Sequence, residues 1–179
     1  TWGGVLDNDV VYDDIGIPFI PAKRVKGLLV ESAIDVFQAI ANSTINKKWQ
    51  PEHLFDLFGL PGRETSAPII VDDARIEHYD ERRAWLAWAQ QAAPEIASSM
   101  QVLALFTTTR AQTAIATGRE KKLAAGVAKP HSLRIQRVLK RGLIFESNVI
   151  ILNEPKNSAI NYESLLVLAA AANKHMGLN

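Results

Sequence analysis

The spacing of apolar residues along the chain predicts several helices. In residues 22–42 the apolar side chains recur at intervals of three and four, as one buried helical stripe requires. Residues 51–58 begin with a proline and are followed by Gly59, a pattern typical of a short helix. Further helices are predicted over residues 82–91, 95–106 and 164–175. Trp85 and Trp88, three residues apart, are expected to face the core.

Other segments have the patterns of strands. Residues 67–76 are rich in β-branched side chains. Residues 133–138 alternate, with Leu133, Ile135 and Arg137 on one face and the intervening residues on the other, and residues 142–152 predict a longer strand. Between residues 107 and 129 the periodicity disappears, and this stretch is long enough for an extended hairpin. The order of elements predicts an α+β fold with helices on one face of an antiparallel sheet.

Composition places the chain among globular proteins and excludes several chemistries. Of the 179 residues 47% are hydrophobic and 22% are charged. Cysteine is absent, so disulfides, thiolate catalysis and cysteine-ligated metal sites are excluded. No apolar run is long enough for a membrane span, and the first residues lack the pattern of a signal peptide. We expect a cytoplasmic protein that does not bind a membrane.

The formal net charge of +1 conceals an uneven distribution. Residues 107–148 carry nine basic side chains and two acidic ones, whereas the rest of the chain carries eleven basic and seventeen acidic ones. Such a segment is either a binding surface for phosphates or a solvated basic surface that aids solubility.

The first turns of the helix predicted at residues 22–42 carry Lys23, Arg24 and Lys26. The helix dipole is positive at this end, so three cations there are unfavourable unless an anion approaches. Alternatively, the three side chains extend into water.

Motifs of common enzymes are missing, including the phosphate loop, the nucleophile elbow and the zinc-binding HExxH. Four carboxylates, Asp7, Asp9, Asp13 and Asp14, lie within eight residues. Oxygen ligands of this kind can hold Mg²⁺, but clustered aspartates also stabilise turns through bonds to the backbone.

A series of short motifs resembles one known family. The segments LDNDVVYD at residues 6–13 and GIPFIPAKRVKG at residues 16–27 come first. LFG at residues 57–59, VDDA at 71–74, QTAI at 112–115, GVAK at 126–129, LRIQRV at 133–138 and GLIFE at 142–146 follow in order. Together they are similar to the RAMP superfamily of CRISPR-associated proteins.

Within that superfamily the chain is most similar to a backbone subunit or domain of a type III effector complex, of a type III-D-like kind. The resemblance implies an RRM-like, ferredoxin-like domain over residues 1–179 with an inserted thumb hairpin at residues 110–131. It also implies that the chain is a fragment of a longer polypeptide. The implied partners are guide RNA, target RNA and other effector subunits.

The resemblance also implies roles for individual residues. Asp7 would cleave target RNA with a divalent cation such as Mg²⁺, and Asp7 and Asp9 would hold that metal. The RNA-binding residues would be Lys23, Arg24, Lys26, Arg110, Gln112, Lys129, His131 and Arg134.

Two further readings remain open. The chain resembles, as an alternative, a subunit without catalysis that binds the 5′ handle of the guide RNA and caps the complex. A small-molecule enzyme is a third possibility, for which the sequence offers no motif.

Overall fold

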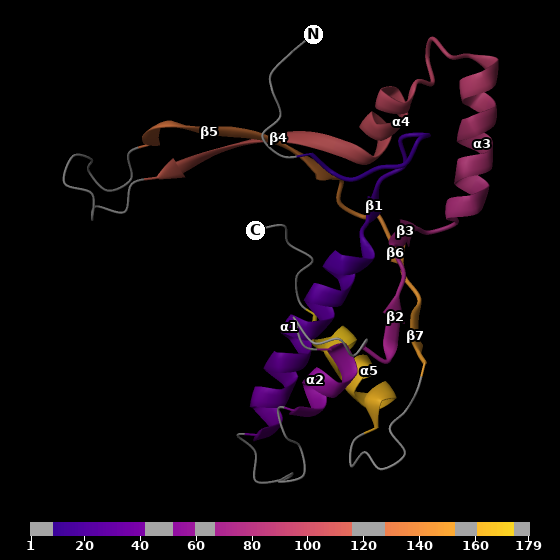
Figure 1. The fold of residues 1–179 in the computed structure, drawn as a ribbon. Helices are drawn as coiled ribbons and strands as arrows, with labels where there is room; N and C mark the ends of the chain where they lie inside the picture. Colours follow the sequence, from indigo (N-terminus) through magenta and orange to yellow (C-terminus); the bar gives the residue numbers. More distant parts are fainter. Residues whose placement is uncertain (1–8, 42–51, 60–66, 116–127, 153–160, 174–179) are drawn as a thin grey trace. The chain divides into compact units, whose positions relative to one another are not determined.

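The computed structural model describes residues 9–41, 52–59, 67–115, 128–152 and 161–173 (Figure 1). This part of the chain has an α+β fold, and none of its helices is long and apolar enough to cross a membrane. The helices are α1 (Ala22–Ala41), α2 (Glu52–Phe58), α3 (Tyr79–Ala92), α4 (Ser99–Phe106) and α5 (Tyr162–Ala172). The strands are β1 (Phe19–Ile20), β2 (Ile69–Val71), β3 (Ala74–Ile76), β4 (Thr107–Ile115), β5 (Ala128–Leu139), β6 (Phe145–Glu146) and β7 (Val149–Ile151).

The described strands form three small sheets, whereas the sequence predicts one. One sheet has the strand order β1-β3-β6, and the other two are the pairs β2-β7 and β4-β5. Both pairs are antiparallel. The α+β class is as expected; the strands predicted over residues 67–76 and 142–152 are divided, whereas β5 is longer than the predicted strand at residues 133–138.

Polar residues explain the division of the two longest predicted strands. Residues 67–76 are interrupted after β2 by Asp72, and residues 142–152 are interrupted before β7 by Ser147 and Asn148. Ser147 Oγ donates to the Asp72 carbonyl at 2.7 Å, and the Asp72 amide donates to the Asn148 carbonyl at 2.9 Å. The two interruptions therefore lie beside each other and satisfy each other's polar groups.

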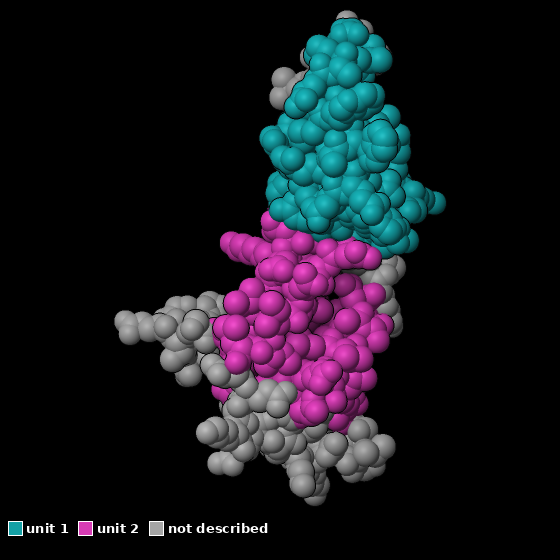
Figure 2. All heavy atoms as spheres, turned by 90° about the vertical axis from the view of Figure 1, so that its right-hand side faces the viewer, with its two compact units in different colours: residues 1–19, 75–145 teal, residues 20–74, 146–179 magenta. Residues whose placement is uncertain are grey.

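The chain divides into two compact units, which Figure 2 colours separately. Unit 1 comprises residues 1–19 and 75–145, and unit 2 comprises residues 20–74 and 146–179. Each unit is thus assembled from segments that are distant in the sequence.

The core of unit 2 lies among α1, α2, α5 and β2. It buries Leu29 and Ala33 of α1, Leu57 of α2 and Leu165 of α5, and none of these side chains is more than 8% exposed. Ile69 of β2 belongs to the same cluster. The helix predicted over residues 22–42 is confirmed, and of its predicted stripe Leu29 and Ala33 are buried, while Val25 and Phe37 are partly buried against the same core.

The core of unit 1 forms around a loop that precedes β1. Ile15 and Ile17 of this loop pack with Ile76 of β3 and with Val102 and Phe106 of α4. Gly16 between them has a φ of +101°, and a Cβ atom there would overlap the backbone of Ser99. Only glycine therefore fits where the loop crosses the start of α4.

The prediction that Trp85 and Trp88 face the core is wrong. Their side chains are 71% and 63% exposed, and their rings meet edge to face with centroids 6.1 Å apart. The face of α3 directed at the core instead carries Leu86 and Ala87, which pack against the cluster of unit 1. Gln90, on that same face, donates from Nε2 to the Ile15 carbonyl at 2.8 Å.

The exposure of the two tryptophans gives a prediction on stability. Replacing both, as Trp85→Gln with Trp88→Gln, should change the free energy of unfolding by less than about 1 kcal/mol, because little buried area is lost. Leu103→Ala is the matched comparison: Leu103 is 1% exposed, and its truncation should cost about 2–5 kcal/mol. Urea unfolding measures both, and a double tryptophan variant as unstable as Leu103→Ala would contradict the placement of α3.

Candidate nucleic-acid interface

The long strands β4 and β5 pair with each other as an antiparallel ribbon (Figure 1). The regular part of the register runs from Thr107 opposite Leu139 to Thr113 opposite Leu133. In an antiparallel pair, two residues directly opposite each other project from the same face. The register therefore decides which side chains share a surface.

One face of the ribbon carries four side chains rich in hydrogen-bonding groups. Arg110 lies opposite Gln136, and Gln112 lies opposite Arg134, so two arginines and two glutamines occupy adjacent positions. We call these four residues the Arg-Gln quartet. Arg110, Gln112 and Arg134 are exposed, and Gln136 is half-buried. Neither strand contains an acidic residue.

The two arginines of the quartet are free to meet an external anion. Among the described residues, no carboxylate or carbonyl pairs with the side chain of Arg110 or Arg134. A guanidinium presents a planar fork of donors that fits phosphate or carboxylate oxygens. Two such forks on a surface without acids can bind a polyanion.

The other cations at the base of the ribbon have partners within the chain. Arg137, on the opposite face from the quartet, donates from Nη1 to both carboxylate oxygens of Asp9 at 3.0 and 2.9 Å. Lys140 Nζ donates to the carbonyls of Ala104 and Leu105 at 3.1 and 2.8 Å. These carbonyls belong to the last turn of α4, where a cation is favourable. Arg137 and Lys140 therefore connect β5 and the residue after it to Asp9 and to the end of α4.

The predicted thumb coincides in part with this ribbon. Of residues 110–131, the described portions lie in β4 and β5. Residues 116–127 lie outside the described residues. Lys129 and His131 belong to β5, and their side chains also lie outside the described part of the structure.

The three cations at the start of α1 lie in unit 2. Lys23 and Arg24 are exposed, and Lys26 is half-buried. The amide of Ala22, the first residue of α1, donates to Asp73 Oδ1 at 2.7 Å. The positive end of this helix thus already has an anion from its own chain, and any ligand would be bound by the lysine and arginine side chains themselves.

Of the two aspartates predicted to act in cleavage, only Asp9 lies among the described residues. Asp7 lies outside the described residues. Asp9 is described, and its carboxylate is bound by Arg137. Within the described residues no group of three or more His, Asp or Glu side chains could hold a metal ion. The described residues alone do not make a Mg²⁺ site.

Asp13 and Asp14 form the loop before β1, as expected for turn residues. Asp13 Oδ1 accepts from the amides of Ile15, Gly16 and Ile17 at 2.8–3.0 Å. Asp13 Oδ2 accepts from the Tyr79 hydroxyl at 2.8 Å. The carboxylate thus has a bond for each of its oxygens and serves the fold.

The environment of Tyr79 changes its acidity. Burial raises the pKa of Tyr79 above its ordinary value of 10.0, and the adjacent Asp13 carboxylate raises this pKa further. Arg75, whose guanidinium carbon lies 4.3 Å from the centroid of the Tyr79 ring, acts in the opposite direction. The neutral hydroxyl, which donates to Asp13, is the form that the folded protein holds.

Sequence reasoning missed two residues of these surfaces. Gln136 completes the quartet, and the alternation of residues 133–138 is the signal that places it on the face of Arg134. Asp73 binds the start of α1, but the sequence separation of 51 between Asp73 and Ala22 leaves no local signal for this contact.

Comparison with models of known protein families finds no match to this chain, and comparison with curated proteins finds no similar sequence.

The bond between Tyr79 and Asp13 gives a prediction on the pH dependence of stability. Tyr79→Phe should lower the free energy of unfolding by about 1 kcal/mol at neutral pH, since it removes one partly buried hydrogen bond. Because the pKa of Tyr79 is raised by folding, its contribution is present below pH 10.0 and is lost as the pH rises through the folded value. The stability of Tyr79→Phe should therefore fall less steeply than that of the native protein above pH 10.0.

Urea unfolding at a series of pH values measures this difference. Tyr162→Phe is the matched comparison: burial also raises the pKa of Tyr162, so its alkaline slope should flatten too, but it removes no bond to Asp13. Equal alkaline slopes for the native protein and Tyr79→Phe would refute the assignment.

Proposed function

We propose that this chain binds RNA through the Arg-Gln quartet of the β4-β5 ribbon. The observation that carries the proposal is the presence of two exposed arginines that, among the described residues, have no partner and share a ribbon face without carboxylates. Arginine forks bind the phosphate backbone, and glutamine side chains can donate to and accept from ribose or base edges. Such a surface binds a strand chiefly through its phosphates and is therefore sensitive to salt.

The resemblance described in the sequence analysis makes the proposal more specific. We infer a RAMP-type, RRM-like domain of a type III CRISPR effector complex, with the ribbon as its thumb against guide RNA. Lys23, Arg24 and Lys26 would add phosphate contacts from α1. Other effector subunits and a complementary target RNA would be the remaining partners.

The proposed chemistry is cleavage of the target RNA. Once the backbone is held in line, the 2′-hydroxyl of RNA loses its proton and attacks the adjacent phosphorus, the bond from phosphorus to the 5′-oxygen breaks, and a 2′,3′-cyclic phosphate and a protonated 5′-hydroxyl result. The protein need only impose that geometry and assist proton transfer. We assign the assisting carboxylate to Asp7 and propose that Mg²⁺ is required for target cleavage only. Asp9 is the weaker candidate, because Arg137 already binds its carboxylate.

The alternative function is a subunit that binds the 5′ handle of the guide RNA and does not cleave. The pairing of Asp9 with Arg137 favours it, since this pair removes one of the two proposed metal ligands. RNA binding by the quartet is common to both functions, and cleavage distinguishes them.

The RNA-binding proposal gives a prediction on affinity. Arg110→Gln with Arg134→Gln should weaken binding to single-stranded RNA regardless of its sequence. Each lost phosphate contact should lower the slope of log affinity against log salt concentration by about 0.7, so the double variant should lose about 1.4. Fluorescence anisotropy with a labelled RNA at several salt concentrations gives the slope.

Two controls show whether the quartet itself is responsible. Arg82→Gln also removes an exposed positive charge from unit 1, but from α3, and it should leave the slope near the native value. Arg137→Gln should lower stability through loss of the Asp9 pair and change the slope little. An unaltered slope in the double quartet variant would overturn the proposal.

The proposed role of Asp7 gives a prediction on catalysis. Asp7→Asn in the assembled effector complex should abolish Mg²⁺-dependent cleavage of complementary RNA while changing guide affinity by less than about 1 kcal/mol, because a transition-state contact need not affect ground-state binding. Cleavage is followed on gels with Mg²⁺ and with a chelator. Full cleavage by Asp7→Asn would remove Asp7 from the mechanism, and no cleavage by the native complex would favour the handle-binding function.

A further inference from the structure

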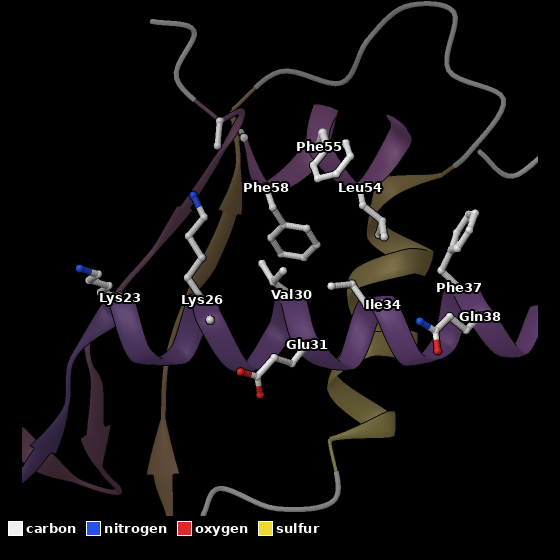
Figure 3. A pocket seen from close by; sticks show the side chains of 13 residues that line it. Lys23, Lys26, Val30, Glu31, Ile34, Phe37, Gln38, Leu54, Phe55 and Phe58 are labelled. Carbon is white, nitrogen blue, oxygen red and sulfur yellow. The ribbon is translucent and has the colours of Figure 1, made fainter. Parts of the chain in front are cut away.

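A groove of about 930 Å³ lies between α1 and α2 in unit 2 (Figure 3). Its lining follows α1 from Lys23 to Gln38, a separation of fifteen residues, which corresponds to roughly 22 Å along a helix axis. Phe55 and Phe58 of α2 lie on the opposite side. A groove of this volume is at the upper end of the range of small-molecule sites.

The groove exposes a second apolar stripe of α1. Val30, Ile34 and Phe37 line it, and Val30 and Phe37 are also partly buried against the core that contains Leu29 and Ala33. Ile34 remains 40% exposed and Phe55 remains 47% exposed. The described structure therefore leaves a continuous apolar surface in contact with water along both walls.

The polar residues of the groove are unevenly distributed. Lys23 and Lys26 lie together at one end, and within the described residues neither ammonium pairs with a carboxylate. In Figure 3, Lys26 projects from α1 on the side of Val30 and Phe58, whereas Glu31 projects on the other side of the helix. Positive charge thus lies at one end of the groove, whose lining is otherwise mostly apolar but also includes Glu31 and Gln38.

From this arrangement we infer that the groove binds a fatty acid, with its hydrocarbon chain between α1 and α2 and its carboxylate beside Lys23 and Lys26. The apolar walls match the hydrocarbon chain, and the lysines at this end of the groove attract a terminal anion. A polyanion such as RNA would leave the apolar walls unused. Lys23 and Lys26 are also proposed above to contact RNA, but the Arg-Gln quartet, which carries the RNA proposal, lies in unit 1. Loss of fatty-acid binding and loss of RNA binding by the quartet can therefore be told apart.

Gly27 supplies a variant that blocks the groove without harming the fold. Gly27 lines the groove, and a Cβ atom built on it meets nothing within 4 Å in the described structure. Leucine is also a better helix former than glycine in a helix interior. Gly27→Leu should therefore fill the groove while leaving the melting temperature unchanged or higher.

The test uses dodecanoate, 1-dodecanol and acetate as probes of the native chain, with binding measured by calorimetry and by the rise in melting temperature. Dodecanoate should bind, acetate should not, and affinity should increase about fourfold for each methylene in the series from octanoate to dodecanoate. Lys23→Gln with Lys26→Gln should lower the affinity for dodecanoate about fivefold and the affinity for dodecanol less than about twofold. Gly27→Leu should abolish the binding of both.

Matched controls are available on the same helix. Arg24→Gln removes a neighbouring charge that does not line the groove, and Ala39→Leu adds a side chain of equal size outside it. Both should bind dodecanoate like the native protein. The inference is overturned if dodecanoate does not bind, if Arg24→Gln weakens it as much as the lysine variant does, or if Gly27→Leu leaves its affinity intact.

Discussion

One carboxylate organises unit 1. Asp13 Oδ1 accepts three consecutive backbone amides, and this bends the chain so that Ile15 and Ile17 enter the core on either side of Gly16. Its second oxygen accepts the Tyr79 hydroxyl and so fixes the first turn of α3. Bonds to a charged acceptor are stronger than neutral ones, and four of them converge here. The position of α3 therefore depends on the loop before β1.

This anchoring explains why the tryptophans of α3 are outside. The helix has two candidate inner faces, one with Trp85 and Trp88 and one with Tyr79, Leu86 and Gln90. Apolar area alone favours the tryptophans, but Tyr79 and Gln90 hydrogen-bond to the loop and turn their own face inward. Periodicity in the sequence predicts the helix. Which face of the helix turns inward depends on hydrogen bonds from Tyr79 and Gln90 to residues 66 and 75 positions earlier in the chain.

In the rest of the fold and in the candidate site, too, local patterns predict the elements, and contacts distant in the sequence do not show. Local spacing predicts α1 and α2 almost to their ends, and alternation predicts the faces of the strand at residues 133–138. The count of basic residues at 107–148 also identifies the charged segment. Alternation places Arg134 and Arg137 on opposite faces, but it does not show that Arg137 is bound to Asp9, because Asp9 lies 128 residues earlier in the chain. Arg134 has no such partner among the described residues.

The cations of α1 show how a contact distant in sequence changes the meaning of a local pattern. Taken alone, Lys23, Arg24 and Lys26 at a positive helix end call for an external anion. Asp73 already supplies a negative charge to the amide of Ala22, so the helix itself needs no ligand. What remains unexplained by the fold is the position of Lys23 and Lys26 at the end of an apolar groove. That position, rather than the helix dipole, is the reason to expect a ligand at this end of α1.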